Sequence, residues 1–465
     1  MAPPSATSSS SFSLVLSLLS LSLLTLENLS LVAARAVAEE YRVVSADSLI
    51  PATVCSAQKA ASPSKLIVVH RRGPCSPLSR KSDPSHADLL RHDQARVDSI
   101  NRLPAAVAGS LATTLPVTPG IALGVGNYIV SIGLGTPRKD FSVVFDTGSD
   151  LTWIQCNPCQ SCYSQQDPIF DPAQSTTYAN ISCSSSFCNE LDDRSCSSSS
   201  TCQYSVRYGD QSQTNGSFVQ DTLTVAGDEI AGFRYGCGHQ NSGLFGRADG
   251  LLGLGREPVS LVVQTGQKYG MVFSYCLPPR SNGTGYLTLG GSGGAAREIQ
   301  YTPLLTNPKL PTFYFVKLVD IAVGGQRLGI PPAVFSASQG AIVDSGTVIT
   351  RLPPAAYDQL RRKFQQLMPS YPRAPALSIL DTCYDFTGRQ TVSVPAVALV
   401  FDGGLTANLD FKGIIYVANV SQACLAFAGN DDPADLLIVG NVQQRTFNVV
   451  YDLASLRIGF GPNGC

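Results

Sequence analysis

Apolar residues along most of the chain occur in short runs that are separated by clusters of turn-forming residues. The runs have the composition of β-strands, and the intervening clusters include "YGDQS", "LGGSGG" and "FDGG". Gly occurs 41 times and Pro 30 times, as expected for a chain with many tight turns. The pattern therefore predicts a mostly β protein that is rich in hairpins.

Two stretches depart from this pattern and predict helices. The stretch "HADLLRHDQARVDSI" (86–100) has the pattern of an amphipathic helix, and "SKLIVVHRRGPCSPL" (64–78) before it contains one strand. In "LPPAAYDQLRRKFQQLM" (352–368), two prolines can open a helix. Four large side chains then recur at three- and four-residue spacing along one face: Tyr357, Leu360, Phe364 and Leu367.

Two apolar runs end in an aspartate that is followed by a hydroxyl residue and a glycine. The first is "VVFDTGSDLTW" (143–153) with Asp146, and the second is "AIVDSGTVIT" (341–350) with Asp344. Each motif has a later echo in which apolar residues lead to Gly, "DGLLGLG" and "DLLIVGN". This is the pattern of a divergent internal duplication. A boundary near residue 305 leaves one aspartate in each half.

The residues around the two aspartates suit a shared carboxylate site. Gly148 and Gly346 allow tight turns that bring backbone N–H groups to a carboxylate. Hydroxyl groups stand at matching offsets, on Thr147, Ser149, Ser345 and Thr347. If the motifs face each other, the like charges share one proton, because both cannot ionise cheaply at contact distance.

Such a pair can hydrolyse an amide directly. One carboxylate activates a water molecule while the protonated partner donates to the carbonyl oxygen, without a metal, a cofactor or a covalent intermediate. The alternative is that each aspartate only caps a turn, which would be the better interpretation of a single Asp-Thr-Gly. Two echoed copies favour catalysis by Asp146 and Asp344.

The N-terminal region predicts targeting and processing. "FSLVLSLLSLSLLTL" has the length of a signal-peptide core, and "AVA" at 36–38 is a candidate cleavage site, so we assign residues 1–38 to a secretory signal. The Ser-rich, acid-free start also permits a chloroplast transit peptide. No hydrophobic tail follows "GFGPNGC", so we expect no membrane anchor.

Residues 39–115 differ in charge from the rest and suggest a propeptide. They carry ten Lys or Arg against seven Asp or Glu, whereas the chain from residue 116 onward is acidic. A basic segment before an acidic body suggests docking that depends partly on charge. Three of the four histidines lie in this segment: His70, His86 and His92. The alternative is an exposed N-terminal extension.

Cysteine and glycosylation signals support the secretory route. Of 14 cysteines, 12 follow residue 150, and "CNPCQSC" (156–162) alone could suggest zinc. The following cysteines lie in Ser-rich sequence, and the only histidine beyond residue 92 is His239, so we expect disulfides and no metal. Four Asn-x-Ser/Thr sequons are candidate glycosylation sites: Asn180, Asn215, Asn282 and Asn419.

Other signals have ordinary interpretations. The formal net charge is -1 and "RRK" (361–363) lies on the solvated face of a predicted helix, so we expect no nucleic-acid partner. "GLLGLGRE" lacks a following Lys-Ser/Thr and Rossmann spacing, which argues against phosphate binding. His239 is interpreted as a loop residue, because the aspartate pair needs no additional base.

From about residue 126 to the end, the chain resembles the pepsin-like aspartic endopeptidases and, within them, the plant nepenthesin-type group. The resemblance implies an all-β, bilobal fold with a pseudo-twofold axis and a few short helices. It implies that Asp146 and Asp344 bind the lytic water, that Thr147 and Ser345 brace the two loops against each other, and that Ser149 and Thr347 bond the outer carboxylate oxygens.

The resemblance also assigns a flap and an insert. "VRYGDQS" (206–212) is similar to the flap hairpin, with Tyr208 over the cleft and Trp153 as its partner. Gln211 departs from the usual flap glycine. The cysteine-rich stretch 156–202 is similar to the nepenthesin-type insert. The implied disulfides are Cys156–Cys159, Cys162–Cys237, Cys183–Cys202, Cys188–Cys196, Cys276–Cys465 and Cys383–Cys424.

Together these observations predict four parts: a signal peptide at 1–38, a propeptide at 39–115, an N-terminal lobe at 116–305 and a C-terminal lobe at 306–465. We expect a monomeric, secreted aspartic endopeptidase that is made as a zymogen and cleaves polypeptides at acidic pH. Its expected partners are polypeptide substrates, its own propeptide and pepstatin-type inhibitors. The alternatives are an inactive inhibitor on the same fold, a vacuolar location, and a chloroplast protease.

Overall fold

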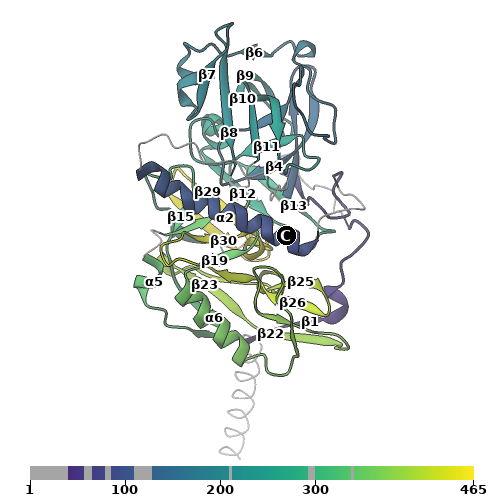
Figure 1. Cartoon of the computed structure of the whole chain (residues 1–465), viewed down its shortest axis with the longest axis vertical. Helices are drawn as coiled ribbons and strands as arrows, with labels where there is room; N and C mark the ends of the chain where they lie inside the picture. Colours follow the sequence, from purple (N-terminus) through teal and green to yellow (C-terminus); the bar gives the residue numbers. More distant parts are fainter. Residues whose placement is uncertain are drawn as a thin grey trace, which may run out of the picture.

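The computed structural model describes residues 40–56, 65–78, 85–108, 128–208, 212–291, 299–336 and 340–465. Two β-rich lobes are stacked along the long axis, and helix α2 (His86–Ala108) lies across their junction (Figure 1). The expected signal peptide and the tip of the expected flap, residues 209–211, lie outside the described residues.

The largest sheet has 15 strands and continues from the N-terminal lobe through the junction between the lobes. Strands from the end of the chain pair in this sheet with strands of the first half, so the sheet joins both lobes. Its members are β2 (Lys65–His70), β3 (Tyr128–Leu134), β4 (Lys139–Asp146), β5 (Trp153–Gln155), β6 (Ala179–Asn180), β7 (Arg194–Cys196), β8 (Cys202–Arg207), β9 (Gln213–Val225), β10 (Asp228–Ser242), β11 (Gly250–Gly253), β12 (Val272–Cys276), β13 (Thr284–Leu289), β14 (Gln300–Pro303), β29 (Asn448–Asp452) and β30 (Arg457–Gly461).

The C-terminal lobe is built from smaller sheets. A five-stranded sheet contains β15 (Phe315–Val316), β18 (Ala341–Val343), β28 (Leu437–Val439), β19 (Thr350–Leu352) and β27 (Phe427–Gly429). One four-stranded sheet contains β17 (Gln326–Arg327), β16 (Leu318–Val323), β23 (Val397–Phe401) and β24 (Thr406–Asn408). The other contains β20 (Arg373–Ala374), β21 (Cys383–Tyr384), β26 (Gln422–Leu425) and β25 (Ile415–Asn419).

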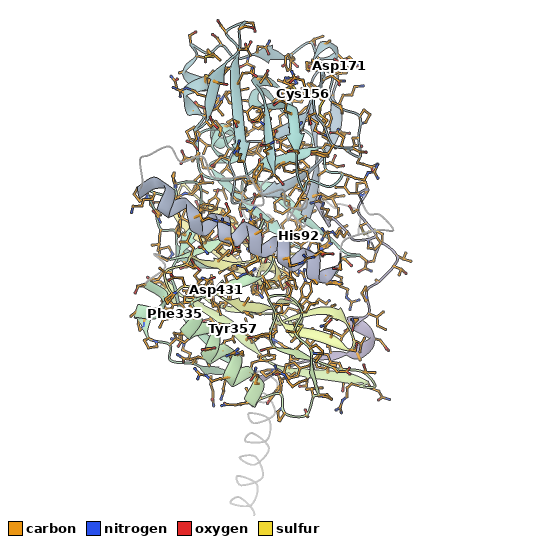
Figure 2. All side chains as sticks on the ribbon, viewed as in Figure 1. His92, Cys156, Asp171, Phe335, Tyr357 and Asp431 are labelled. Atoms are coloured by element: carbon orange, nitrogen blue, oxygen red, sulfur yellow. A yellow bond between two sulfur atoms is a disulfide. The ribbon has the colours of Figure 1, made fainter. Side chains whose placement is uncertain are left out.

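The other helices that the structure describes are short, and the mostly β prediction is confirmed. The α-helices are α3 (Leu261–Gln264), α4 (Gly266–Tyr269), α5 (Pro332–Ser336), α6 (Pro354–Gln366), α7 (Phe411–Ile414) and α8 (Asn441–Gln444). The 3-10 turns are η1 (Ala46–Leu49), η2 (Pro172–Gln174), η3 (Ser186–Glu190) and η4 (Asp402–Gly404). Helix α6 buries Tyr357, Leu360 and Phe364, as the spacing predicts, and Leu367 is half-buried beyond its end (Figure 2).

The two sequence echoes have a structural meaning. In the first half, β11 runs parallel to β4, and Gly253 is the register partner of Asp146. In the second half, β28 runs parallel to β18, and Val439 is the register partner of Val343 just before Asp344. Each aspartate therefore stands at the end of a strand that is fixed by its echo strand, which is the arrangement expected of a duplicated unit.

The described parts of the N-terminal segment, residues 40–56, 65–78 and 85–108, are packed onto both lobes. Strand β1 (Tyr41–Ser45) forms an antiparallel pair with β22 (Thr391–Pro395) in the C-terminal lobe. Strand β2 lies between β3 and β13 in the large sheet. Backbone hydrogen bonds of β1 and β2 and the buried face of α2 therefore attach the segment. Attraction between opposite net charges accounts for only part of the attachment.

All 14 cysteines form disulfides, two of them within the N-terminal segment as Cys55–Cys75. The expected pairs Cys276–Cys465 and Cys383–Cys424 are present. Four expected pairs are wrong, because the structure contains Cys156–Cys237, Cys159–Cys162, Cys183–Cys196 and Cys188–Cys202 instead. Disulfide frameworks of this density are typical of proteins that fold in oxidising compartments.

Strand register and burial explain the observed pairing. Strand β10 places Cys237 beside Ile154 of β5, and Cys156, two residues on, lies on the same face with a Cα–Cα distance of 5.3 Å to Cys237. In the insert, Cys188 and Cys202 are buried in one apolar cluster, so they pair with each other. The more exposed Cys183 and Cys196 form the second bond.

Candidate active site

Asp146 and Asp344 lie together between the lobes. Asp146 is the last residue of β4, and Asp344 directly follows β18. Their side chains are 2% and 0% exposed. The Gly148 N–H donates to Asp146 Oδ1 at 3.0 Å, and the Gly346 N–H donates to Asp344 Oδ1 at 2.9 Å. The two loops therefore hold their carboxylates in the same way, as the sequence motifs suggest.

The close approach of the loops requires glycine at both positions. A Cβ atom on Gly148 would lie 2.9 Å from Asp344 Oδ1. A Cβ atom on Gly346 would lie 2.5 Å from Asp146 Oδ1. Each glycine thus makes room for the carboxylate of the opposite loop, which is a closer contact than side-chain carbon atoms tolerate.

Hydroxyl groups link the two loops across the junction. The Ser345 N–H donates to Thr147 Oγ1 at 2.9 Å, and the Thr147 N–H donates to Ser345 Oγ at 3.1 Å. These reciprocal bonds connect the lobes directly beneath the carboxylates. Both side chains are buried, so the bonds are protected from water.

The outer hydroxyls are not equivalent. Thr347 Oγ1 donates to Asp344 Oδ2 at 2.6 Å. The buried hydroxyl of Ser149 has no partner of good hydrogen-bond geometry in the described part of the chain, and its proximity to Asp146 is the weakest of the contacts that lower the pKa of that residue. Arg96 contacts both oxygens of Asp146 instead, so the symmetry expected from the motifs is broken at this point.

Residues that the sequence interpretation missed support the second loop. Gln444, on α8, donates from Nε2 to the Asp344 carbonyl at 3.1 Å, and its Oε1 accepts the Tyr275 hydroxyl. Asn441 donates from Nδ2 to the Ser345 carbonyl at 3.0 Å. The signal for these residues was their position in "DLLIVGNVQQ", directly after the second echo.

Arg96 of α2 bridges the two aspartates. Its Nη2 lies 2.9 Å from Asp146 Oδ1 and 3.1 Å from Asp344 Oδ1, and its Nε lies 3.1 Å from Asp344 Oδ2. The guanidinium therefore fills the space in which a small molecule could contact both carboxylates. The sequence offered one signal, because Arg96 shares the buried face of its helix with Val97 and Ile100.

The two carboxyl groups differ in acidity. Burial raises the pKa of Asp146, and the charge of Asp344 adds to this effect, so that the pKa lies above the usual value although Arg96 opposes the shift. Burial also acts to raise the pKa of Asp344, but Arg96 and the Thr347 hydroxyl outweigh it and leave the pKa below the usual value. While Arg96 is in place, a proton bound by the pair is therefore favoured on the Asp146 side.

The expected flap residues are in contact. The Trp153 indole N–H donates to the Tyr208 hydroxyl at 2.8 Å, and both rings meet the ring of Phe245 edge-on. Tyr208 belongs to the lining of a cavity that also includes Arg96 and Gly148. Gln211, which departs from the usual flap sequence, lies outside the described residues.

The remaining candidate residues lie away from the pair. His239 contacts Ser217 and the Pro158 carbonyl in the N-terminal lobe. The sequon residues Asn180 and Asn419 are exposed and Asn215 is half-exposed. The Asn282 side chain is 8% exposed and donates to the Val54 carbonyl, so this sequon has no room for a glycan while the N-terminal segment is in place.

Two family models match the body of the chain. The model described as "Xylanase inhibitor N-terminal" matches residues 128–291, and the model described as "Xylanase inhibitor C-terminal" matches residues 313–462. An aspartyl protease family protein of Arabidopsis thaliana is 48% identical over 445 residues, which cover 92% of this chain and 93% of that protein. Aspartic proteinase nepenthesin-2 of Nepenthes gracilis is 34% identical over 385 residues, covering 81% of this chain and 85% of that protein.

Solved structures of low identity share the fold. The structure of edgp has a TM-score of 0.60 at 19% identity and covers 72% of this chain and 91% of its own. Soybean basic 7S globulin has a TM-score of 0.59 at 21% identity and covers 72% of this chain and 93% of its own. In the part of the chain that the structure describes, no helix combines the length and apolar character needed to cross a membrane.

The unequal outer hydroxyls lead to a prediction. Thr347→Val should lower stability at neutral pH by about 2 kcal/mol, because it removes a hydrogen bond to a charged group. It should also raise the pKa of Asp344. Ser149→Ala should have a smaller effect on stability and should leave the pKa of Asp344 unchanged, since its hydroxyl lies near Asp146 without good hydrogen-bond geometry. Denaturant unfolding and a carbon-13 NMR titration of the carboxyl groups would test this, and equal losses in both variants would contradict it.

Proposed function

The chain belongs to the plant pepsin-like aspartic protease family, and from this premise we propose that it is an endopeptidase that hydrolyses polypeptides with the Asp146–Asp344 pair. The observation that carries the proposal is that one guanidinium group reaches both buried carboxylates at about hydrogen-bond distance. A water molecule in the same place would contact both carboxylates once Arg96 has left.

The unequal hydrogen bonding assigns a role to each residue, because the Thr347 hydroxyl bonds to Asp344 independently of Arg96 and favours the charged form of that residue. Asp344, as the carboxylate, takes a proton from the water while the water oxygen bonds to the carbonyl carbon of the substrate. Asp146 donates its proton to the carbonyl oxygen. In the second half of the reaction, the carbon–nitrogen bond breaks, the leaving amine takes a proton from Asp344, and Asp146 recovers its own. The bonds and protons of this hydrolysis balance without a metal or a cofactor.

The N-terminal segment is proposed as an inhibitory propeptide. Arg96 occupies the pair, and Val97 and Ile100 pack on the apolar wall formed by Phe313, Ile342 and neighbouring residues. A chain held in this way cannot admit a substrate to the carboxylates. The family description as a xylanase inhibitor keeps an inactive binding protein as the competing hypothesis, although both aspartate loops are intact here.

Buried histidines make the attachment of this segment sensitive to acid. Burial, assisted by Arg445 and Arg72, lowers the pKa of His70 to about 3, and burial likewise lowers the pKa of His92, on α2 (Figure 2), to about 4. Burial also lowers the pKa of His86, whose Nδ1 contacts the Tyr416 hydroxyl at 2.7 Å. In the released segment these groups return toward about 6.5.

The lowered pKa values of the three histidines determine how attachment of the segment depends on pH. Above about pH 7.5 the histidines are largely neutral in both states, so the attachment is strongest. As the pH falls toward 4, the released state binds more protons and is favoured. Burial raises the pKa of Asp93, which acts in the opposite direction, but three histidines outweigh this single carboxyl in number.

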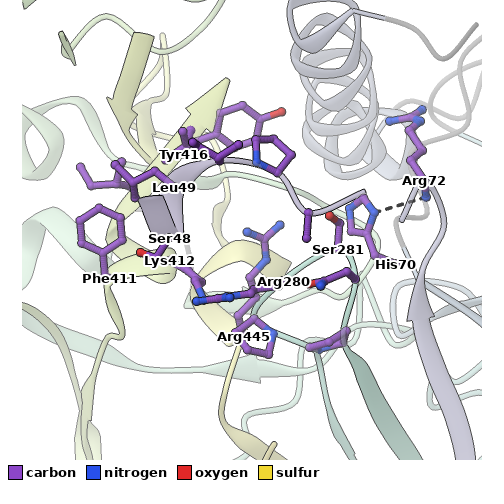
Figure 3. A pocket seen from close by; sticks show the side chains of 18 of the residues that line it. Ser48, Leu49, His70, Arg72, Arg280, Ser281, Phe411, Lys412, Tyr416 and Arg445 are labelled. Atoms are coloured by element: carbon purple, nitrogen blue, oxygen red, sulfur yellow. Dashed lines mark hydrogen bonds between the residues drawn. The ribbon is translucent and has the colours of Figure 1, made fainter. Parts of the chain in front are cut away.

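The surroundings of His70 and His86 add to this sensitivity. Both line a cavity of about 370 Å³ between the N-terminal segment and the body (Figure 3). No acidic side chain is among the described residues that line it. Four cations are: Arg72, Arg280, Lys412 and Arg445. A proton bound by either histidine would therefore be placed among positive charges.

The proposed activity has a direct test. Asp146→Asn and Asp344→Asn should each lower the rate of digestion of an unstructured protein at acidic pH by at least about a thousandfold, because the pair acts as one unit. Asp140→Asn, on the exposed start of β4, is the matched control. A pepstatin-type inhibitor should block the wild type. An acid-treated wild type that digests nothing but binds a glycosidase would support the inactive alternative.

Latency should depend on Arg96. Arg96→Gln should raise the rate of self-processing at mildly acidic pH by about tenfold or more, because it removes charge-assisted bonds to both aspartates. Arg91→Gln changes the exposed face of the same helix and should leave latency intact. N-terminal sequencing over time would measure both. Equal latency in the two variants would remove Arg96 from this role.

The pH dependence of release should depend on the segment histidines. Replacing His70, His86 and His92 by Asn should move the midpoint of processing to lower pH, because fewer protons are taken up on release. His239→Asn, in the N-terminal lobe, should leave the midpoint unchanged. Loss of the precursor and dissociation of the cut segment from the body are both followed between pH 7 and pH 3, since the histidines act on release. An unchanged midpoint in the triple variant would refute the histidine mechanism.

A further inference from the structure

A second charged contact lies one helical turn from Arg96. Asp93 accepts the Val348 N–H at Oδ1 at 2.6 Å and the Ile349 N–H at Oδ2 at 3.0 Å. Arg351 Nη2 forms an ion pair with Asp93 Oδ2 at 3.0 Å, and both side chains are 0% exposed. The carboxylate of Asp93 is thus bound by two backbone donors and one ion pair of the wall that continues from the second aspartate loop.

The groups that balance the charge of Arg351 belong to α2. Among the described residues, Asp93 is the carboxylate that pairs with Arg351, and Gln94 Oε1 accepts its Nε at 3.2 Å. In the described part of the body, the partner of Arg351 is the Ile349 carbonyl, which accepts Nη1 at 2.8 Å. Once the helix leaves, a cation and two backbone donors are left on the wall of the cleft.

The wall formed by Arg351 and the two backbone N–H groups favours the binding of an anion. A buried cation without a partner is costly, and a carboxylate that makes charge-assisted hydrogen bonds offsets that cost. The position also lies under the same helix that places Arg96 on the aspartate pair. Three residues of helix span about 4.5 Å, which corresponds to one or two residues of an extended chain at about 3.3 Å each. Asp93 therefore stands where a substrate side chain near the scissile bond would lie.

We propose that Arg351 is a specificity-determining residue that selects substrates carrying Asp or Glu one or two residues from the scissile bond. The inference rests on the proposed peptidase function and names the substrate class of that site. In the uncleaved chain, Asp93 occupies the position that we assign to the acidic side chain of the substrate. Arg351 binds this side chain and takes no part in the chemical step.

Matched peptides test the proposal. The full chain is processed in acid and assayed near pH 5 on peptides in which Asp or Asn is moved through the positions beside one scissile bond. At one position Asp should exceed Asn by about tenfold or more in kcat/KM. Arg351→Met should abolish the preference and Arg351→Lys should retain part of it. The preference should fade below about pH 4, where the substrate carboxyl is protonated.

Controls separate this inference from failure of the proposed activity. Arg362→Met, on an exposed face of α6, should keep the wild-type preference. The double variant Asp93→Asn/Arg351→Met removes the buried pair together, so that a folding defect of the single variant does not decide the outcome. Equal cleavage of Asp and Asn peptides by the wild type would overturn the inference while the activity stands.

A binding measurement gives a readout that needs no turnover. A peptide of residues 86–102 should bind the acid-processed wild type about tenfold or more tightly than its Asp93→Asn version. The two peptides should bind Arg351→Met equally. If the wild type cleaves no substrate but still binds the two peptides with different affinities, the proposed peptidase activity is wrong and carboxylate recognition by Arg351 is supported. The absence of the difference in the wild type would overturn the inference.

Discussion

The structure is organised around the repulsion between two buried carboxylates. Asp146 and Asp344 are brought together by loops that leave no room for a Cβ atom, so their charges must be compensated. Backbone N–H groups, one threonine hydroxyl and Arg96 supply that compensation. The duplicated strands, the cross-bracing hydroxyls and the covering helix all serve to hold this otherwise unfavourable arrangement.

The features that could be predicted from sequence are those encoded locally. The aspartate loops were identifiable because an apolar strand, a carboxylate and a glycine are adjacent in the chain. Helix α6 followed from the spacing of Tyr357, Leu360 and Phe364. The echo strands were recognisable from composition, and their parallel pairing with β4 and β18 gives the physical reason for the repetition.

The features that escaped prediction depend on distant parts of the chain. The pairing of Cys156 with Cys237 follows from the register between β5 and β10, which no spacing reveals. Arg96 and Asp93 are charged residues on a helix, and such residues usually face solvent. Only the packing of α2 against both lobes shows that they are buried and paired.

The position of β2 has a consequence for the fate of the N-terminal segment. Because β2 hydrogen-bonds to β3 on one side and to β13 on the other, it is a structural strand of the body as well as part of the segment. Cutting the chain after α2 would leave this strand in place. Its departure would split one continuous sheet and expose two strand edges, which readily accept another chain. Cleavage of the chain and dissociation of the segment are therefore separate events. Dissociation requires the two exposed strand edges to be paired again.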